Sequence, residues 1–174
     1  KNDERIRAVL LNGSRANNTI EKDDLQDFDL VFLVEELDSF ATNPNWIENF
    51  GERIILQTPN SMNLYGSNEN SIENELVYLM LFKDHNRIDL TLTKVADRNR
   101  KKDSLTKILL DKDDLFQENL NPNDKDYWMR KPSQKEFSDS CNEFWWVSTY
   151  VVKGLLRDEI IYTQDIKETI LRKM

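Results

Sequence analysis

The pattern of apolar and polar positions in the first part of the chain indicates short β-strands. Residues 6–11 form an apolar run that stops just before Gly13, which predicts a buried strand. Residues 27–35 alternate, so that Asp27 and Asp29 share one face of a second predicted strand while apolar side chains share the other. We expect the apolar face to lie on the core and the two carboxylates to face a cleft.

Two further stretches indicate a β-hairpin, because residues 75–82 and 87–93 both suit strands and are separated by a polar turn. In the second arm, Asp89 interrupts an apolar strand, where a carboxylate is costly unless it is paired or bound to a metal ion. The other elements expected in this part are helices at 14–17, 45–50 and 95–104, strands at 53–57 and 105–110, and loops at 19–26 and 59–74.

Near Pro132 the pattern changes to a helical period. Ser133 and Glu136 have the spacing of a capping box, in which each side chain accepts from a free backbone N–H group of the first turn. Apolar side chains then recur at helical spacing as far as Leu155, and a second helix is expected from about residue 158.

This change of period predicts two domains, residues 1–131 and residues 132–174. The chain begins at Lys1 without an initiator Met and ends at Met174 within a helical pattern. We therefore expect a fragment of a longer protein, in which the second, helical domain is truncated.

Composition indicates a soluble globular protein of 174 residues, with 39% hydrophobic and 32% charged residues. No apolar run approaches the ~20 residues that span a bilayer, and no secretion leader is recognisable, so we expect neither membrane association nor export. Cys141 is the single cysteine, which excludes an internal disulfide framework and fits a reducing cytoplasm. His85 is the single histidine, which argues against a histidine metal site.

The net charge of −8 argues against broad nucleic-acid binding, which depends on Lys and Arg neutralising phosphates. An acidic surface instead concentrates metal cations or a polycationic substrate. Acidity also keeps a protein soluble, and on charge alone this simpler explanation is the stronger of the two.

Three aspartates and a Gly-Ser turn suit nucleotidyl transfer, in which a hydroxyl group attacks the α-phosphate of a nucleotide. Asp27 and Asp29 can share a metal ion from one strand face, and Asp89 can complete the cluster from a neighbouring strand. Mg²⁺ prefers such hard oxygen ligands, and two such ions can neutralise the phosphates and align the attacking hydroxyl. Gly13 lets the backbone approach the triphosphate, and Ser14 adds a hydroxyl and an N–H group.

Six segments carry a closer resemblance. They are Leu-Asn-Gly-Ser-Arg-Ala-Asn (11–17), Gln-Asp-Phe-Asp-Leu-Val (26–31), Leu-Met-Leu-Phe-Lys-Asp (79–84), Asn-Arg-Ile-Asp-Leu-Thr-Leu (86–92), Arg-Lys-Pro (130–132) and Asn-Glu-Phe-Trp-Trp-Val (142–147). In these segments the chain resembles the aminoglycoside 6-adenylyltransferase family, the streptomycin-modifying branch of the nucleotidyltransferase superfamily. The resemblance implies an α+β fold: a nucleotidyltransferase-type mixed β-sheet domain with flanking helices, then a helical C-terminal domain that is partly present here.

The same resemblance implies a reaction and its partners. AMP would pass from ATP to the 6-hydroxyl of streptomycin, with Mg²⁺ as cofactor and release of pyrophosphate, and this would confer antibiotic resistance. ATP and a cationic aminoglycoside are then the expected partners of a cytoplasmic enzyme that is a monomer or weak dimer. Family members continue past the position of Met174, so we expect part of the antibiotic pocket to be absent.

Each candidate residue has a simpler alternative. The expected metal ligands are Asp27, Asp29 and Asp89. Asp89 is also a candidate for the general base that takes the proton from the attacking hydroxyl. The candidates for phosphate binding are Gly13, Ser14, Arg15 and Lys153. For Arg15 the alternative is a surface ion pair, and for Lys153, which the resemblance suggests, it is a solvated helix lysine.

Acidic and aromatic side chains of the helical part are candidates for binding the antibiotic. They are Glu136, Asp139, Glu143, Trp145 and Glu159. Carboxylates can bind guanidinium groups through paired hydrogen bonds, although each is more often part of a solvated helix face, and Trp145 is as compatible with a helix core. Two other functions stay open: a sister nucleotidyltransferase acting on another hydroxyl, and a non-catalytic nucleotide-binding relative.

Overall fold

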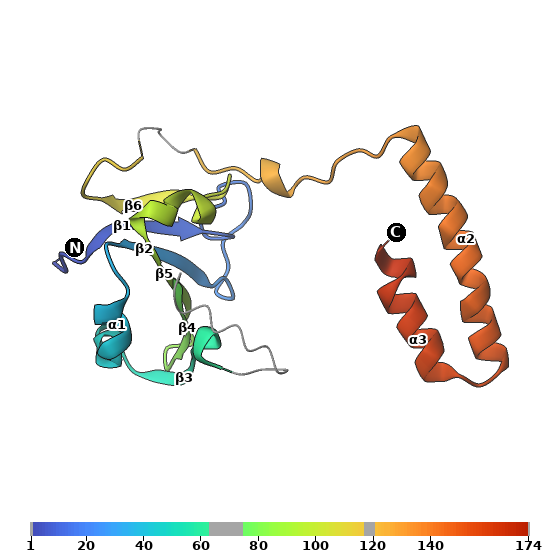
Figure 1. The fold of residues 1–174 in the computed structure, drawn as a ribbon, viewed down its shortest axis with the longest axis horizontal. Coiled ribbons are helices and arrows are strands. Elements are labelled where there is room, and N and C mark those ends of the chain that lie inside the picture. Colours follow the sequence, from blue (N-terminus) through green and yellow to red (C-terminus); the bar gives the residue numbers. More distant parts are fainter. Residues whose placement is uncertain (1, 63–74, 117–120, 174) are drawn as a thin grey trace. The chain divides into compact units, whose positions relative to one another are not determined.

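The structure is a computed structural model that describes residues 2–62, 75–116 and 121–173. The chain forms two compact units, Lys1–Trp128 and Met129–Met174, which are described separately (Figure 1). The strands are β1 (Ile6–Asn12), β2 (Phe28–Val34), β3 (Arg53–Gln57), β4 (Glu75–Phe82), β5 (Arg87–Lys94) and β6 (Lys107–Asp111). The α-helices are α1 (Asp38–Thr42), α2 (Gln134–Leu156) and α3 (Ile160–Thr169), and the 3-10 helices are η1 (Pro44–Phe50), η2 (Pro59–Ser61), η4 (Val95–Lys101), η5 (Lys125–Tyr127) and η6 (Leu171–Lys173).

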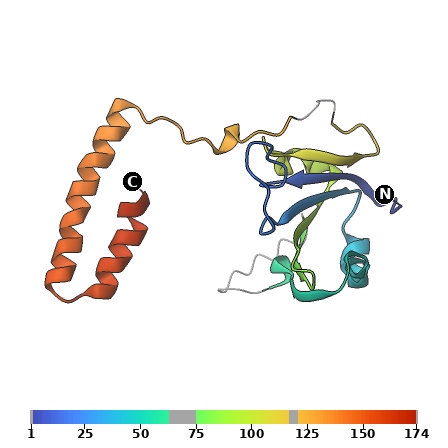
Figure 2. The same cartoon turned by 180° about the vertical axis from the view of Figure 1, so that it is seen from behind.

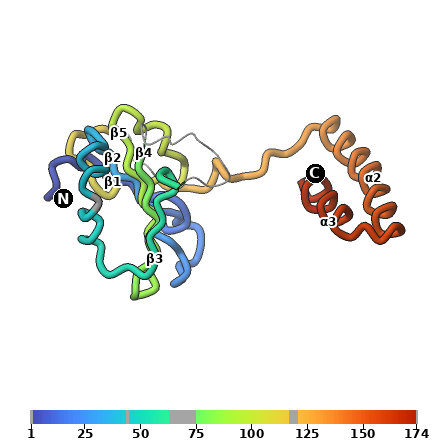
Figure 3. Tube along the Cα trace, turned by 60° about the horizontal axis from the view of Figure 1, so that its bottom comes forward, coloured from blue at the N-terminus to red at the C-terminus, as the bar shows by residue number. Residues whose placement is uncertain are grey.

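The first unit is built on one six-stranded sheet with the strand order β3-β4-β5-β2-β1-β6. β2 and β5 pair in parallel, whereas the other neighbours pair antiparallel, so the expected mixed sheet and α+β class are confirmed. β3 lies at one edge of the sheet, beside β4 (Figure 3). The predicted hairpin of residues 75–82 and 87–93 is confirmed as β4 and β5.

Apolar clusters lie on both faces of this sheet, and successive residues of a strand contribute to opposite faces. One face packs against α1 and η1 through Phe40 and Ile47, together with Leu90 and Leu92 of β5. The other face has a smaller cluster that includes Leu10 and is confined to one part of the sheet. Among the described residues, a cleft lies over another part of this second face, and Asp29 and Asp89 line it.

The predicted helix at residues 14–17 is wrong. The segment forms tight turns, in which the Asn17 N–H donates to Ser14 O at 3.2 Å. The Asn17 side chain then accepts from the Thr19 N–H at 2.9 Å, an Asx turn that diverts the backbone from a helical path. Because few apolar residues follow, a helix here would have no face to bury.

Other local predictions need smaller corrections. The helices expected at 45–50 and 95–104 are the 3-10 helices η1 and η4, and the strand expected at 105–110 is β6, which starts at Lys107. Helix α1 was not predicted, because its five residues are too short for a helical period to show. Most of the loop expected at 59–74 lies outside the described residues.

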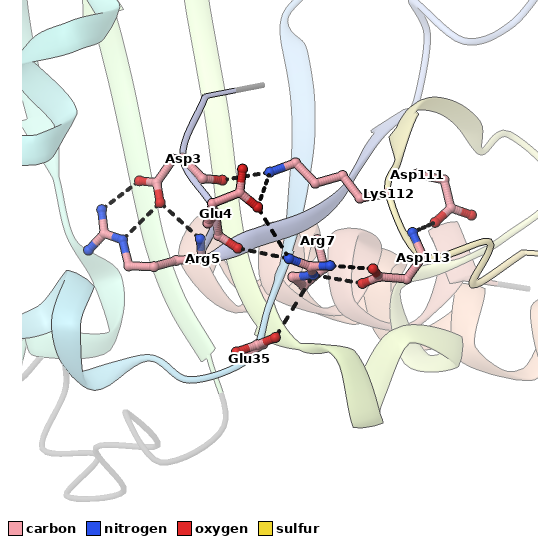
Figure 4. Close-up of polar contacts among 8 residues, drawn as sticks. All are labelled: Asp3, Glu4, Arg5, Arg7, Glu35, Asp111, Lys112 and Asp113. Carbon is pink, nitrogen blue, oxygen red and sulfur yellow. Dashed lines mark hydrogen bonds and ion pairs between the residues drawn. The ribbon is translucent and has the colours of Figure 1, made fainter.

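A cluster of charged side chains ties the start of β1 to the ends of β2 and β6 (Figure 4). Arg7 Nε donates to the Asp113 carboxylate at 2.7 Å and lies 3.9 Å from Glu35. Lys112 Nζ donates to Asp3 O at 2.9 Å. The cluster fixes the end of β1 that is remote from the Gly-Ser turn.

In the second unit, α2 and α3 run side by side, as Figure 2 shows from behind. The capping box of Ser133 and Glu136 at the start of α2 is confirmed. A Cβ atom on Gly154 would lie 2.2 Å from Thr163 Oγ1, so a glycine is needed where α2 meets α3. Among the described helices, none combines the length and apolar character needed to cross a membrane.

Candidate active site

One row of directly opposed residues crosses five strands on the open face of the sheet. Asn12 of β1 lies opposite Asp29 of β2, and Asp29 lies opposite Asp89 of β5. Leu79 of β4 and Gln57 of β3 continue the row beyond Asp89. Directly opposed residues on neighbouring strands share a face. The parallel pairing of β2 and β5 therefore brings Asp29 and Asp89 together from distant parts of the sequence.

Gly13 is required beside Asp29 for two reasons. Its φ is +68°, in the region that residues with a Cβ atom rarely adopt. A Cβ atom at this position would also lie 2.3 Å from Asp29 Oδ2. The Gly-Ser turn and the carboxylate are therefore in direct contact, as the sequence predicts.

Arg87 is the counter-ion of this carboxylate cluster. Its Nε and Nη2 atoms donate to the two oxygen atoms of Asp89 at 2.8 and 2.7 Å, and its Nη1 atom lies 3.4 Å from Asp27 Oδ2. One guanidinium group therefore links Asp27, two residues before Asp29 in the chain, to Asp89, which lies opposite Asp29 on the next strand.

Burial raises the pKa of the Asp29 carboxyl group above its usual range, and the neighbouring charges of Asp89 and Asp27 raise it further. The Arg87 guanidinium lowers this pKa and offsets part of the effect. Negative charge is therefore not fully compensated at Asp29, and additional positive charge would stabilise its ionised form.

Among the described residues, no three His, Cys, Asp or Glu side chains are already arranged to hold a metal ion. The Arg87 guanidinium pairs with oxygen atoms of Asp27 and Asp89 that a cation would need. The donor set still fits Mg²⁺, which takes carboxylate oxygens. The neighbouring Asn12 Oδ1 atom is buried without a hydrogen-bond donor in the described part of the chain, so the site also has an unused oxygen ligand.

A cleft of about 360 Å³ lies over Asp29 and Asp89, whereas Asp27 is not part of its lining. Its lining comprises Asn12, Gly13, Asp29, Leu30, Val31, Asp89, Thr91, Lys101, Asp103 and Tyr127. The Tyr127 hydroxyl donates to the Asp103 carboxylate, and this bond together with burial raises the pKa of Tyr127 to about 12. Lys101 pairs with Glu75 at 2.5 Å. The cleft is therefore mostly acidic, with Lys101 as the cation in its lining.

Sequence reasoning did not select Arg87, Asp103 or Tyr127 as site residues. Arg87 could have been found, since it precedes Asp89 by two positions in a strand and must share its face. No sequence signal places Asp103 and Tyr127 in the cleft, because each belongs to an irregular segment whose path depends on tertiary packing.

The predicted phosphate-binding residues of the first unit differ in their surroundings. Ser14 lies in the turn beside Gly13. Arg15 Nε donates to Gln26 O at 2.9 Å, and the guanidinium carbon lies 3.8 Å from the centroid of the Phe28 ring. Arg15 therefore contacts the segment that leads into β2. This structural role is an alternative to binding phosphate.

The candidates in the second unit all lie on or beside its helices. Hydrogen bonds from Arg130 and then from Ser133 at the helix start lower the pKa of Glu136 to about 2. Asp139 pairs with Lys135 at 2.7 Å, and Lys153 Nζ lies 5.5 Å from the Tyr150 ring centroid. The others are Glu143 and Trp145, exposed on α2, and Glu159, which precedes α3.

Comparison with known proteins gives a consistent set of relatives. The family described as streptomycin adenylyltransferase matches residues 1–174. An aminoglycoside 6-adenylyltransferase of Bacillus subtilis (strain 168) is 45% identical over 174 residues, which cover 98% of this chain and 60% of that protein. The aminoglycoside 6-adenylyltransferase of Campylobacter jejuni is 47% identical over 175 residues, which cover 99% of this chain and 59% of that protein.

A crystal structure of an aminoglycoside 6-adenyltransferase from Bacillus subtilis matches with a TM-score of 0.52 and 40% identity. The match covers 98% of this chain and 58% of that one. The chain therefore spans about three fifths of the length of the relatives that it matches.

Proposed function

The chain belongs to the streptomycin adenylyltransferase family, and from this membership we propose that the protein transfers AMP from ATP to a hydroxyl group of an aminoglycoside antibiotic. The specific acceptor that we propose is the 6-hydroxyl of streptomycin. Pyrophosphate is the second product, and modification of the antibiotic confers resistance. The relatives named above are aminoglycoside 6-adenylyltransferases, which supports this choice of acceptor.

The contact between Gly13 and Asp29, with Asp89 on the next strand, is the observation that carries the proposal. In the reaction, the acceptor oxygen forms a bond to the α-phosphorus while the bond from that phosphorus to the bridging oxygen of pyrophosphate breaks. The backbone at Gly13 and Ser14 would bind the triphosphate. Asp89 would contact the acceptor hydroxyl, either as the base that takes its proton or as a ligand that orients it.

Asp27, Asp29 and Asp89 are the residues that would hold Mg²⁺; Asp29 and Asp89 line the cleft with Asn12, whose Oδ1 atom is buried, and Asp27 is linked to Asp89 through Arg87. The raised pKa of Asp29 supports a cation at this position, because uncompensated negative charge favours one. Bound Mg²⁺ would neutralise charge on the triphosphate and so lower the barrier to its cleavage. Arg87 would have to release oxygen atoms of Asp27 and Asp89 to admit it.

For the rest of the protein, we propose that residues 1–131 are the nucleotidyltransferase domain and that residues 132–174 begin the domain that binds the antibiotic. Lys153 would contact the leaving phosphates. The side chains proposed for the antibiotic are Glu136, Asp139, Glu143, Trp145 and Glu159. The net charge of −8 supports a cationic acceptor. A reaction that consumes ATP, in a chain with one cysteine, supports a cytoplasmic location.

Pyrophosphate release from ATP and Mg²⁺, measured across a panel of aminoglycosides, tests the proposal. We expect release with streptomycin for the wild-type full-length protein and none for Asp29→Asn, with Asp24→Asn in an exposed loop as the matched control. Release with another acceptor would favour a sister nucleotidyltransferase. The absence of release with every acceptor would favour a non-catalytic relative.

A further inference from the structure

The open face of β3 and β4 continues the carboxylate row as an aliphatic surface. Leu79 lies opposite Asp89, and Leu81 lies opposite Arg87. Ile55 of the edge strand lies opposite Leu81 in turn. We call Ile55, Leu79 and Leu81 the aliphatic shelf. It adjoins the catalytic carboxylates on the side away from Gly13, which follows β1.

A hollow of about 250 Å³ lies over the aliphatic shelf. Its lining comprises Ile55, Gln57, Leu79, Met80, Leu81 and Arg87. Ile55 is 56% exposed, although it is a large apolar side chain at the centre of a strand. Pockets for drug-sized ligands start at roughly 300 Å³, so this hollow suits a single ring. An exposed apolar surface of this kind next to an active site is typical of a ligand contact.

The direction of the reaction assigns this side of the row to the acceptor. The triphosphate is proposed to bind at the Gly13 turn, which borders Asp29 from the β1 side. The attacking hydroxyl must approach the α-phosphorus from the side opposite to the leaving pyrophosphate. With the pyrophosphate toward β1, the opposite side lies toward Asp89, β4 and β3 in the strand order β1-β2-β5-β4-β3.

We propose that the aliphatic shelf packs against the C–H face of the acceptor ring that carries the reacting hydroxyl. This inference rests on the proposed function and adds a binding surface to it. Sugar and cyclitol rings combine polar edges with faces of C–H groups, and aliphatic side chains remove such faces from water. The Gln57 amide at the far end of the row can donate to and accept from ring hydroxyls.

Ile55→Ala in the full-length protein tests this proposal, with Leu56→Ala as the matched control. Leu56 is 44% exposed on the same strand, and it pairs with Met80 on the opposite face of the sheet. For Ile55→Ala we expect KM for streptomycin to rise about fivefold, the loss expected when one to two methylene groups lose their burial. KM for ATP and the melting temperature should stay unchanged, and Leu56→Ala should leave KM for streptomycin unchanged.

Equal KM values for streptomycin in Ile55→Ala and Leu56→Ala, with an active wild type, would overturn the shelf and leave the proposed function standing. A lower melting temperature or a changed oligomeric state at unchanged KM would assign the shelf to protein packing and would also overturn it. A wild type that releases no pyrophosphate with streptomycin would remove the proposed function, and the shelf with it.

Discussion

At the scale of single residues, the site depends on a partly buried carboxylate that is packed against the backbone at Gly13. Asp29 occupies the space that a side chain at position 13 would need. Its burial and the charges around it oppose ionisation. Arg87 relieves part of this repulsion in the free protein. The position of Asp29 beside Gly13, its negative charge and its counter-ion Arg87 are therefore coupled. Three substitutions test these three features one at a time.

Gly13→Ala should abolish activity. The new Cβ atom would displace Asp29 and strain a backbone with φ at +68°. Gly51→Ala is the matched control, because Gly51 also has a positive φ, of +115°, but a Cβ there meets nothing closer than Phe82 Cδ1 at 3.9 Å. We expect Gly51→Ala to lower the melting temperature and keep the activity. Equal activity in the two variants would contradict the role given to Gly13.

Arg87→Gln should lower the Mg²⁺ concentration that gives half-maximal activity by about threefold, the factor expected for losing a partly exposed ion pair. The reason is that Arg87 competes with a metal ion for Asp27 and Asp89. A titration of activity with Mg²⁺ measures this. Lys83→Gln is the control, since Lys83 lies in the turn of the same hairpin and pairs with Glu52, which precedes β3. An unchanged Mg²⁺ requirement in Arg87→Gln would argue that the metal does not use these oxygen atoms.

With a chelator present, Asp29→Asn should have a higher melting temperature than wild type at pH 7. In assays with Mg²⁺, the same variant should be inactive. Because the pKa of Asp29 is raised on folding, the native state binds more protons than the unfolded state between the usual and the raised values. Wild-type stability therefore falls as the pH rises through that window, and Asn avoids this loss. Thermal melts from acid to neutral pH should show the advantage growing with pH. A constant difference would contradict the assigned cause.

At the scale of elements, the sequence was informative where the apolar period was long. The hairpin of β4 and β5 and the start of α2 were predicted because alternation or a capping box spans several residues. The segment after Gly13 was mispredicted as a helix, since Ser14 suits an N-cap but the Asn17 side chain closes a turn instead. Short 3-10 helices such as η4 have no period that distinguishes them from α-helices.

The start of α2 gives a prediction at this scale. Ser133→Ala should destabilise the helical unit by about 1 kcal/mol, the usual cost of losing an N-cap.

The pKa of Glu136 is lowered to about 2, first by Arg130 and then by Ser133. Its contribution is therefore complete above the usual Glu range and is lost as the pH falls toward about 2. In a measurement of helicity against pH, Glu136→Gln should lack this acid-dependent step. Glu143→Gln is the control, and its helicity should depend on pH as that of wild type does.

At the scale of the whole molecule, the parallel pairing of β2 and β5 creates the site. The sequence predicted that Asp29 and Asp89 both lie on strands and that they meet in one carboxylate cluster. Strand order and the position of Tyr127 in the cleft could not be read from the sequence, because both depend on long-range packing. The chain spans about three fifths of the length of the relatives that it matches.

Binding of Mn²⁺ together with ATP, followed by electron paramagnetic resonance, tests the central claim most directly, because Mn²⁺ takes the same oxygen ligands as Mg²⁺. We expect wild type to bind Mn²⁺ and Asp29→Asn and Asp89→Asn each to weaken binding by at least about tenfold, whereas Asp24→Asn should not. Equal Mn²⁺ affinity in wild type and both site variants would contradict this claim.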